Sequence, residues 1–424
     1  MGSNLCRRQC PPCNEDRFPA RRVTTCLLWQ FLGLVVAGLA WSVHGAEPDW
    51  PTTLKQARGQ TVYWNAWAGD DRNNRYLQWA GDEVKRQFGV NVRHVKLTDT
   101  AEAVARVVAE KAAGETNRGS VDLIWINGEN FAALKRQGLL YGPFVERLPN
   151  FRWVDTNNLP TLVDFTIPVD GLEAPWGFGQ LVFVYDQARL PHPPTNPAEL
   201  LKWARTSPGR FAYPQPPDFT GTTFLKQLLL SLTTNHPALY APATESEFQN
   251  ISEPLWRYLD ELHPSLWRQG RAFPVNGPAH FRLLSDGEVD VAQSFGADAA
   301  SSGIMSGRLP ATTRTFVFEG GTIANANFLA IPFNAQAKEG AQVLINFLLS
   351  PLAQSRKQDP RILGGETVLD VKRLDPADRA LFEQLPPGVA TLSPEELGKP
   401  LPETHPYWME RLEKEWQRRY GVRK

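Results

Sequence analysis

The chain has 424 residues, which is enough for two or three domains and for a sizeable buried core. Its 45 Lys and Arg residues balance its 45 Asp and Glu residues, so the formal net charge is zero, whereas proteins that bind nucleic acid through bulk charge are clearly basic. Only seven histidines occur, and they leave few ligands for a histidine-rich metal centre.

All four cysteines lie near the start of the chain, at Cys6, Cys10, Cys13 and Cys26. The rest of the chain has no thiol, which excludes a catalytic cysteine, cysteine-bound zinc, an iron–sulfur cluster and disulfides from the body of the protein. Cys10 and Cys13 have CxxC spacing, but no strand–helix pattern surrounds them, so we expect no redox role. We therefore expect neither a cofactor nor a bound metal.

Residues 1–46 have the features of a secretory signal peptide. Arg21-Arg22 precede an uncharged apolar run over 26–41, and small residues follow it. The alternative is an uncleaved membrane anchor, because the run 23–43 is almost long enough to span a bilayer. Glycines inside this run weaken a permanent helix, so we expect cleavage and a periplasmic mature protein. No later run has spanning length, and we expect the remainder to be soluble.

Strand and helix patterns alternate in the first part of the body. Apolar residues recur every four positions from Tyr76 to Phe88 and predict a helix. Asp99 and Glu102 form a capping box that opens a second helix. This strand–helix alternation predicts an open parallel sheet, with ligand chemistry outside the carboxyl ends of its strands. The expected elements are strand 60–65, helix 76–88, strand 90–97, a helix ending at Gly114, and strand 121–126.

The second part of the body has its own α/β pattern. A Gly/Pro-rich stretch leads into a strong strand within 171–186, and Asn196 is expected to cap a helix that starts at Pro197. A second α/β unit begins near 210, and a turn over 219–223 precedes an apolar helix over 224–232. Near the C-terminus an apolar stripe with a spacing of four residues is expected to dock on a lobe; it consists of Trp408, Leu412, Trp416 and Tyr420.

Three segments of the second half carry a family resemblance, together with the Gly/Pro stretch 171–186. They contain, in order, a Gly-Glu-Val-Asp segment, a Glu-Gly turn, an Ile-Pro strand end and a helix ending in Phe-Leu-Leu-Ser-Pro. This succession resembles the extracellular solute-binding proteins, family 1, that serve bacterial ABC importers, in the branch of thiamine, polyamine and ferric-ion receptors. The likeness spans about residues 55–355. The segments are 286–295, 316–334 and 338–354.

The resemblance implies a type II periplasmic-binding fold, in which two α/β lobes joined by crossover strands close around a ligand. It implies as partners a small-molecule ligand and an inner-membrane ABC permease with its cytoplasmic ATPase; we expect a monomer and no nucleic-acid partner. The expected division is a first lobe over 47–175 with about 310–355, a second lobe over 176–309, and a C-terminal helical extension over 356–424 that packs on a lobe.

Loops at strand ends and the first turns of helices supply the candidate ligand-binding residues. The N–H groups at the helix start near Thr220 suit an anionic group. A hinged receptor needs contacts from both lobes, because only a ligand that binds the closed state better can close it. The candidates are Trp67, Asp70, Asn127, Glu129, Trp176, Phe178, Thr220, Gly221, Thr222, Asp298 and Asn325, with Ser294 and Asn327 as further possibilities.

Several of these residues also have a purely structural interpretation. Tryptophans such as Trp64, Trp67 and Trp125 are more often core residues than platforms on which a ligand stacks. Asp70 is equally suited to cap the helix that follows it, and Gly221 to form a turn. These alternatives stay open at the level of sequence.

The ligand is only weakly specified by the residue types. Twelve tryptophans follow residue 46, and aromatic faces beside carboxylates favour an organic cation such as a thiamine-like or polyamine compound. Ferric-binding relatives typically use adjacent tyrosines, and this chain has no Tyr-Tyr pair; an oxyanion or phosphorylated compound stays open. The alternative class is an exported hydrolase, glycosidase-like, that uses an Asp/Glu pair. No nucleophile or metalloprotease motif supports it, so we expect no catalytic residues and no enzyme activity.

Overall fold

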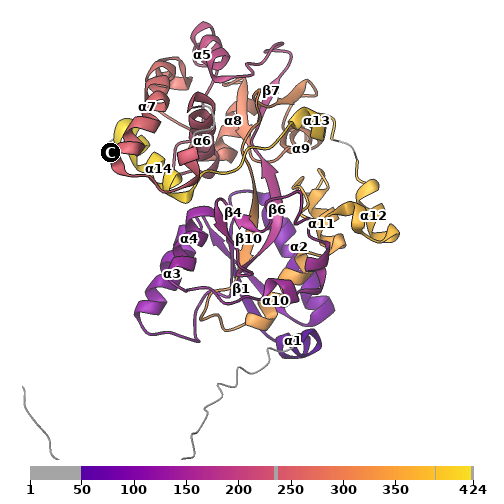
Figure 1. Ribbon diagram of the computed structural model, residues 1–424. Coiled ribbons are helices and arrows are strands. Elements are labelled where there is room, and N and C mark those ends of the chain that lie inside the picture. The colour runs from indigo at the N-terminus through magenta and orange to yellow at the C-terminus, as the bar shows by residue number, and fades with distance from the viewer. Residues whose placement is uncertain (1–48, 234–236, 387, 422–424) are drawn as a thin grey trace, which may run out of the picture. The chain divides into compact units, whose positions relative to one another are not determined.

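The computed structural model describes residues 49–233, 237–386 and 388–421, so the expected signal peptide at 1–46 lies outside the described residues. Two larger sheets organise these residues, in addition to the two-stranded hairpin β4–β5 (163–168), and helices cover each of the larger sheets (Figure 1). We call the five-stranded sheet with its helices the first lobe, and the three-stranded sheet with its helices the second lobe. The expected two-lobe α/β architecture is thus confirmed.

The first lobe contains a mixed sheet in the order β2-β1-β3-β10-β6. Strand β1 pairs in parallel with β2 and β3, whereas β10 runs antiparallel to both β3 and β6. Because β10 inserts between β3 and β6, two distant stretches of the chain build this lobe. The strands are β1 (Thr61–Trp67), β2 (Asn91–Leu97), β3 (Leu123–Ile126), β6 (Glu173–Gln180) and β10 (Ala324–Ala330).

Helices cover both faces of this sheet. Buried side chains of α1, α2, α10 and α11 share one core with Trp64 and Trp176, whereas α3 and α4 pack on the opposite face. Helix α12 packs against α11. The helices are α1 (Trp50–Ala57), α2 (Asp71–Phe88), α3 (Ala101–Ala112), α4 (Gly128–Arg136), α10 (Lys338–Leu348), α11 (Pro351–Gln358) and α12 (Pro376–Glu383).

Local signals set the ends of these helices. Gly89 ends α2 with φ of 73°, a left-handed conformation that costs glycine little. The hydrogen bonds of the capping box expected from Asp99 and Glu102 are present, although Thr100 directly precedes the first residue of α3. The Asp99 carboxylate still accepts from Ala101 N at 2.8 Å, and Glu102 accepts from Asp99 N at 3.1 Å.

The second lobe is built on the sheet order β8-β7-β9, with both outer strands antiparallel to β7. Helix α6 starts at Phe219 rather than at 224, so Thr220, Gly221 and Thr222 lie in its first turn and not in a loop before it. The elements are β7 (Val182–Asp186), β8 (Val291–Ser294), β9 (Thr313–Phe316), α5 (Pro197–Thr206), α6 (Phe219–Thr233), α7 (Glu245–Leu262), α8 (Gly277–Ser285) and α9 (Ala299–Met305).

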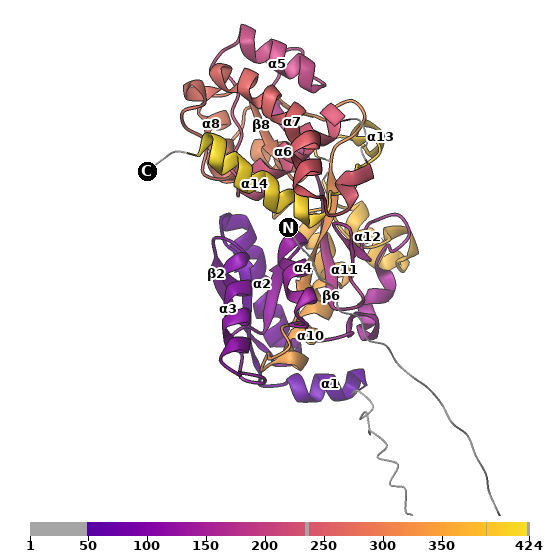
Figure 2. The same ribbon diagram turned by 60° about the vertical axis from the view of Figure 1, so that its left-hand side comes forward.

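The chain passes between the lobes three times. Strand β6 continues into β7 with only Leu181 between them, and residues 317–323 lead back from β9 to β10. The third crossing is the segment 359–405, which leaves α11 and leads to α14 (Pro406–Tyr420) (Figure 2). The lobe boundary that we expected at residue 176 falls inside β6.

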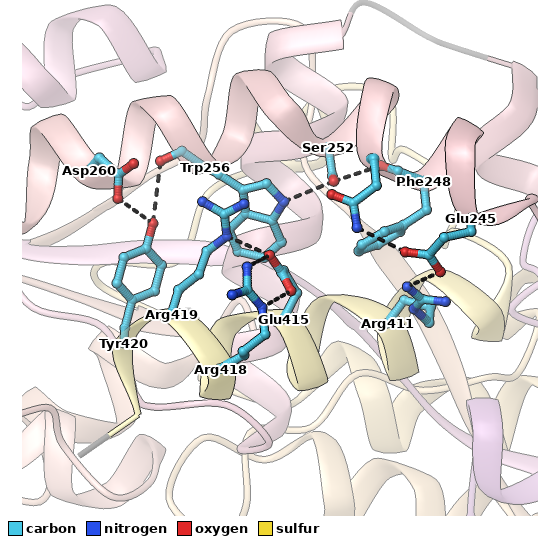
Figure 3. A network of polar contacts seen from close by, with 11 residues as sticks. Glu245, Phe248, Ser252, Trp256, Asp260, Arg411, Glu415, Arg418, Arg419 and Tyr420 are labelled. Carbon is cyan, nitrogen blue, oxygen red and sulfur yellow. Dashed lines mark hydrogen bonds and ion pairs between the residues drawn. The ribbon is translucent and has the colours of Figure 1, made fainter. Parts of the chain in front are cut away.

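Helix α14 is fastened to the second lobe. Trp408, Leu412 and Trp416 of its apolar stripe are buried in the core of that lobe. Polar contacts add to this packing along α7 (Figure 3): Arg411 pairs with Glu245 at 2.6 Å, and the Tyr420 hydroxyl donates to Asp260 at 2.7 Å.

Short elements complete the described chain. The hairpin β4–β5 belongs to the first lobe and contributes to the site described below; its turn consists of Phe165 and Thr166. The remaining elements are β4 (Val163–Asp164), β5 (Ile167–Pro168), α13 (Pro394–Leu397) and the 3₁₀ turns Val145–Arg147, Pro149–Trp153, Pro237–Tyr240, His263–Ser265, Trp267–Gly270 and Val371–Arg373.

Candidate ligand-binding site

A buried lysine of α6 lies where the two lobes and the C-terminal segment meet. The Lys226 side chain is 0% exposed, and its Nζ lies 2.6 Å from Glu403 Oε2. The other oxygen of Glu403 accepts a hydrogen bond from Asn325 Nδ2 at 2.7 Å. A buried ion pair is tolerated only where further hydrogen bonds compensate for desolvation, and Asn325 supplies one. This network connects α6, β10 and the third crossing.

Two aromatic rings flank the same ammonium group. Lys226 Nζ lies 4.4 Å from the ring centroid of Phe165, in the first lobe, and 5.8 Å from that of Phe219, at the start of α6. The negative face of an aromatic ring attracts a cation at these distances. Lys226 is therefore enclosed by a carboxylate and two rings that come from three parts of the chain.

The backbone of Phe165 has an unfavourable conformation. Its φ is 52°, which is unusual for a bulky side chain. The ring packs against Gly128, where a Cβ atom would lie only 2.8 Å from it. The absence of a side chain at Gly128 therefore makes room for the ring beside Lys226.

The loop before α4 is fixed by a buried carboxyl group. Asp164 is 0% exposed, and its Oδ2 accepts a hydrogen bond from Gly128 N at 2.6 Å. Burial raises the pKa of Asp164 well above its usual value. Since Glu129 follows Gly128 directly, Asp164 positions the first turn of α4 and with it the Glu129 side chain.

Three further carboxyl groups have raised pKa values, and two of them, Glu129 and Glu413, interact electrostatically with Lys226. Burial raises the pKa of Glu129 to about 8, and nearby Glu413 raises it further while Lys226 lowers it. Burial raises the pKa of Glu413 to about 7, against a hydrogen bond from Thr222 Oγ1 at 2.9 Å. Burial likewise raises the pKa of Asp218 to about 6. Glu129 belongs to the first lobe and Glu413 to the second, and Glu413 and Lys226 both influence the pKa of Glu129, so acidic groups of both lobes share one region.

The start of α6 is already capped by the protein itself. Asp218 Oδ1 accepts from Thr220 N at 3.0 Å and from Gly221 N at 3.2 Å. The expectation that these N–H groups hold an anionic ligand group therefore needs correction, because a carboxylate of the chain occupies them. Gly221 instead permits close packing: a Cβ there would lie 2.0 Å from the Pro214 carbonyl oxygen.

A cavity of about 160 Å³ adjoins this network. Phe165, Phe178, Asn325 and Glu403 contribute to its wall, so it touches the first lobe, the crossing strands and the C-terminal segment at once. The remaining lining residues are Asn158, Pro160, Val163, Ala324, Pro400, Leu401 and Pro402.

Several residues that the sequence predicted are brought together here. Glu129 lies in the acidic group, Thr222 bonds to Glu413, and Asn325 bonds to Glu403. Phe178 and Asn325 line the cavity. Asn127 is the N-cap residue of α4, directly beside Gly128, and Thr220 lies in the first turn of α6.

Other predicted residues have structural surroundings. Asp70 caps α2, since its Oδ1 accepts from Arg72 N at 2.6 Å and from Asn73 N at 3.4 Å. The Trp176 indole is 2% exposed and packs edge-on against Trp125 and Trp64, with ring centroids 5.0 and 6.0 Å away. Because the indole is enclosed by core side chains, it has no free face for a ligand, contrary to our expectation.

Asp298 and Trp67 lie apart from the lysine network. The Thr391 hydroxyl donates a hydrogen bond to Asp298, and burial raises the pKa of this carboxyl. Asp298 also lies beside Gly364 of the third crossing. Trp67 ends β1 with a half-buried side chain, and its ring lies next to Gly69.

The sequence analysis missed Lys226, Glu403 and Glu413. One signal was present: Lys226 is the only charged residue in the apolar run 219–232, and a lone charge at a buried position of a helix needs a partner. Its partner could not be identified, because Glu403 follows 177 residues later.

Two kinds of feature are absent from the described residues. None of the helices in residues 49–233, 237–386 and 388–421 is long and apolar enough to cross a membrane. Within the same ranges, no three His, Cys, Asp or Glu side chains come together in a way that would hold a metal ion.

Comparison with known proteins identifies the family. A family model described as bacterial extracellular solute-binding protein matches residues 79–357. Protein YnjB of Escherichia coli (strain K12) is 44% identical over 374 residues, which cover 88% of this chain and 94% of that protein.

Solved structures share the fold at low sequence identity. One is the spermidine/putrescine ABC transporter substrate-binding protein PotD from Streptococcus pneumoniae, with a TM-score of 0.56, 14% identity, and coverage of 84% of this chain and 99% of that chain. Another is the periplasmic binding protein AfuA from Actinobacillus pleuropneumoniae with fructose-6-phosphate bound, with a TM-score of 0.58, 16% identity, and coverage of 86% and 99%. These likenesses confirm the periplasmic-binding fold. The family match and the YnjB likeness together show that the chain belongs to the bacterial extracellular solute-binding proteins.

Proposed function

We propose that the protein is a periplasmic receptor that captures a small organic cation between its two lobes and delivers it to an inner-membrane ABC permease. The observation that carries the proposal is the surplus of carboxyl groups around Lys226. Glu129 and Asp164 approach from the first lobe and Glu413 from the second lobe, in addition to Glu403, which pairs with Lys226. A cation placed among them gains attraction from both lobes, which favours the closed state.

The alternative of an anionic ligand has less support. The N–H groups that suit an anion at the starts of α2 and α6 already bind the carboxylates of Asp70 and Asp218. The solved relatives differ in what their names state, a sugar phosphate for AfuA and a polyamine for PotD. The choice of a cation therefore depends on the charges of this chain.

The proposal is tested by native mass spectrometry of protein purified from its own periplasm, followed by calorimetry with the compound found. We expect a cationic ligand, and weaker binding by about tenfold or more in both Glu129→Gln and Glu413→Gln, because each removes a carboxyl group that can ionise when the cation binds. Glu146→Gln is the matched control, since Glu146 is exposed on a 3₁₀ turn of the first lobe. An anionic ligand, or an effect confined to one lobe, would refute the proposal.

We further infer that the protein binds its ligand without converting it. Solute-binding proteins of this family are receptors, and among the sequence motifs we found no nucleophile that would support the hydrolase alternative. Ligand incubated with excess protein is expected to be recovered unchanged after denaturation. A product that forms in proportion to protein concentration would favour the exported hydrolase instead.

Export is the remaining part of the proposal. The apolar run over 26–41 supports cleavage of the signal peptide, with a mature N-terminus between Val43 and Glu47. N-terminal sequencing of the periplasmic fraction tests this, and an intact Met1 in the membrane fraction would contradict it. We expect the mature receptor to act as a monomer that docks on the permease once closed.

A further inference from the structure

The surroundings of Lys226 Nζ are those of a receptor site for a primary ammonium ion. The group has one carboxylate oxygen at 2.6 Å, an aromatic ring centroid at 4.4 Å and a second at 5.8 Å, and it is fully buried. A carboxylate combined with aromatic faces is the usual way in which proteins bind an organic ammonium. Here the bound ammonium belongs to the protein.

The walls of this enclosure are held in place independently of the lysine. Glu403 is 2% exposed and is fixed by Asn325, while the Phe165 ring is wedged against Gly128 at an unfavourable φ of 52°. Backbone strain of this kind persists only where the surroundings enforce it. The enclosure therefore keeps its shape when the chemistry of its occupant changes. We call it the inner ammonium site; its wall residues are Glu403, Phe165 and Phe219.

We propose that Lys226 is a specificity-determining residue: it fills the inner ammonium site with its own Nζ and thereby keeps a ligand's cationic group at the outer carboxylates Glu129 and Glu413. The second part rests on the proposed function, whereas occupancy of the inner site by an ammonium does not. A ligand that carries a second ammonium gains nothing from Glu403, because Lys226 already neutralises that carboxylate. The wild-type receptor is thus expected to bind a diamine no more tightly than a ligand with a single cationic head.

The first experiment is chemical rescue. Lys226→Ala removes three methylene groups and the ammonium, which is the volume and charge of n-propylammonium. We expect this ion at millimolar concentration to raise the Tm of Lys226→Ala by at least about 2 °C and to leave the wild type unchanged, because a ligand that binds only the folded state stabilises it. Neutral n-propanol tests for a volume effect, and tetramethylammonium, which is too wide, tests for a bulk ionic effect.

Two further variants keep the result interpretable. Lys226→Met fills the space with apolar atoms, and Lys226→Ala combined with Glu403→Gln removes both charges; neither is expected to respond to n-propylammonium. If Lys226→Ala alone does not fold, refolding in n-propylammonium is expected to recover it. Failure to recover it, while the double variant folds, would overturn the proposal, as would an equal response to n-propanol.

The second experiment measures selectivity. For the wild type we expect n-butylamine and 1,4-diaminobutane to bind within about threefold of each other, whereas Lys226→Ala should favour the diamine by about tenfold or more. A wild type that already favours the diamine, or a variant that does not, would overturn the role in specificity. If the wild type binds neither amine while rescue by n-propylammonium succeeds, the cationic ligand of the proposed function is wrong and the inner ammonium site stands.

Discussion

Glu129 shows how burial changes the protonation of a single side chain in this protein. Its Oε2 atom is shielded from solvent and has no hydrogen-bond partner among the described residues. Burial raises its pKa to about 8, so near neutral pH the carboxyl group keeps its proton until a positive charge approaches. Binding of a cation would then expel this proton.

The shifted pKa predicts how stability depends on pH. The folded protein holds the Glu129 proton between about pH 4.5 and pH 8, whereas the unfolded chain releases it, so the free energy of unfolding falls as pH rises through this window. In Glu129→Gln this loss is absent. We expect the variant to lose on the order of 3 kcal/mol less than the wild type between pH 5 and pH 8 in urea titrations. Equal slopes for both proteins would contradict the raised pKa; Glu146→Gln should match the wild type.

The position of Trp176 leads to a second prediction at this scale. Since its indole is enclosed by Trp64, Trp125 and Tyr76, Trp176→Ala is expected to lower the free energy of unfolding by about 3–5 kcal/mol. Phe178→Ala is the comparison, because Phe178 is half-buried in the same strand and lines the cavity. Denaturant unfolding measures both. A smaller loss in Trp176→Ala than in Phe178→Ala would restore Trp176 as a candidate ligand platform.

At the scale of elements, helix α14 has two roles, and a different face of the helix performs each role. Its apolar stripe completes the second-lobe core, and Glu413 on another face reaches Thr222 at the start of α6. Helix α14 also contacts α4 of the first lobe. The same helix therefore stabilises one lobe and contributes a carboxyl group to the boundary with the other.

These two roles predict that substitutions on the two faces of α14 lower the free energy of unfolding by different amounts. Trp416 is 1% exposed, and its Nε1 donates to Tyr213 Oη at 2.8 Å, so Trp416→Ala should cost about 3–5 kcal/mol of unfolding free energy. Arg411 forms a partly exposed ion pair with Glu245, and Arg411→Ala should cost about 1 kcal/mol or less. Thermal and urea unfolding distinguish the two. Similar losses would mean that polar contacts, and not core packing, hold α14.

Local signals in the sequence predicted elements well, because helix ends and periodic faces depend on neighbouring residues. Asn196 accepts from Glu199 N at 3.0 Å and starts α5 as expected, and the period-four pattern of α2 is buried as expected. The start of α6 was misplaced, since Asp218 supplies the cap and Thr220 was interpreted as loop. The pairing of Lys226 with Glu403 depends on the tertiary fold, and no local pattern encodes it.

At the scale of the whole described chain, carboxyl groups from both lobes surround one region, and three crossings connect the lobes. A cation that binds between the lobes lowers the free energy of the closed arrangement by its difference in affinity for the two states. Under the proposed function, closure is therefore coupled to the charges on both sides of the boundary.

Small-angle scattering tests this coupling. Addition of the ligand is expected to decrease the radius of gyration, and Glu129→Gln should need about tenfold more ligand for the same decrease, because the variant has lost one attraction that favours closure. Glu146→Gln serves as the control. A radius that stays constant at saturating ligand would show that binding does not close the lobes.

The insertion of β10 between β3 and β6 has a consequence for biogenesis. Until residue 330 has crossed the membrane, β3 and β6 each lack their shared neighbour, so the first-lobe sheet cannot close. The core of the second lobe is completed later still, because Trp408 and Trp416 of α14 belong to it. With the export that we propose, the first lobe can pack only after its last helices have crossed and the second lobe only after α14 has crossed, so most of the polypeptide stays compatible with a channel that accepts unfolded chains. Native packing of the second lobe is then expected only after nearly the entire chain has been delivered.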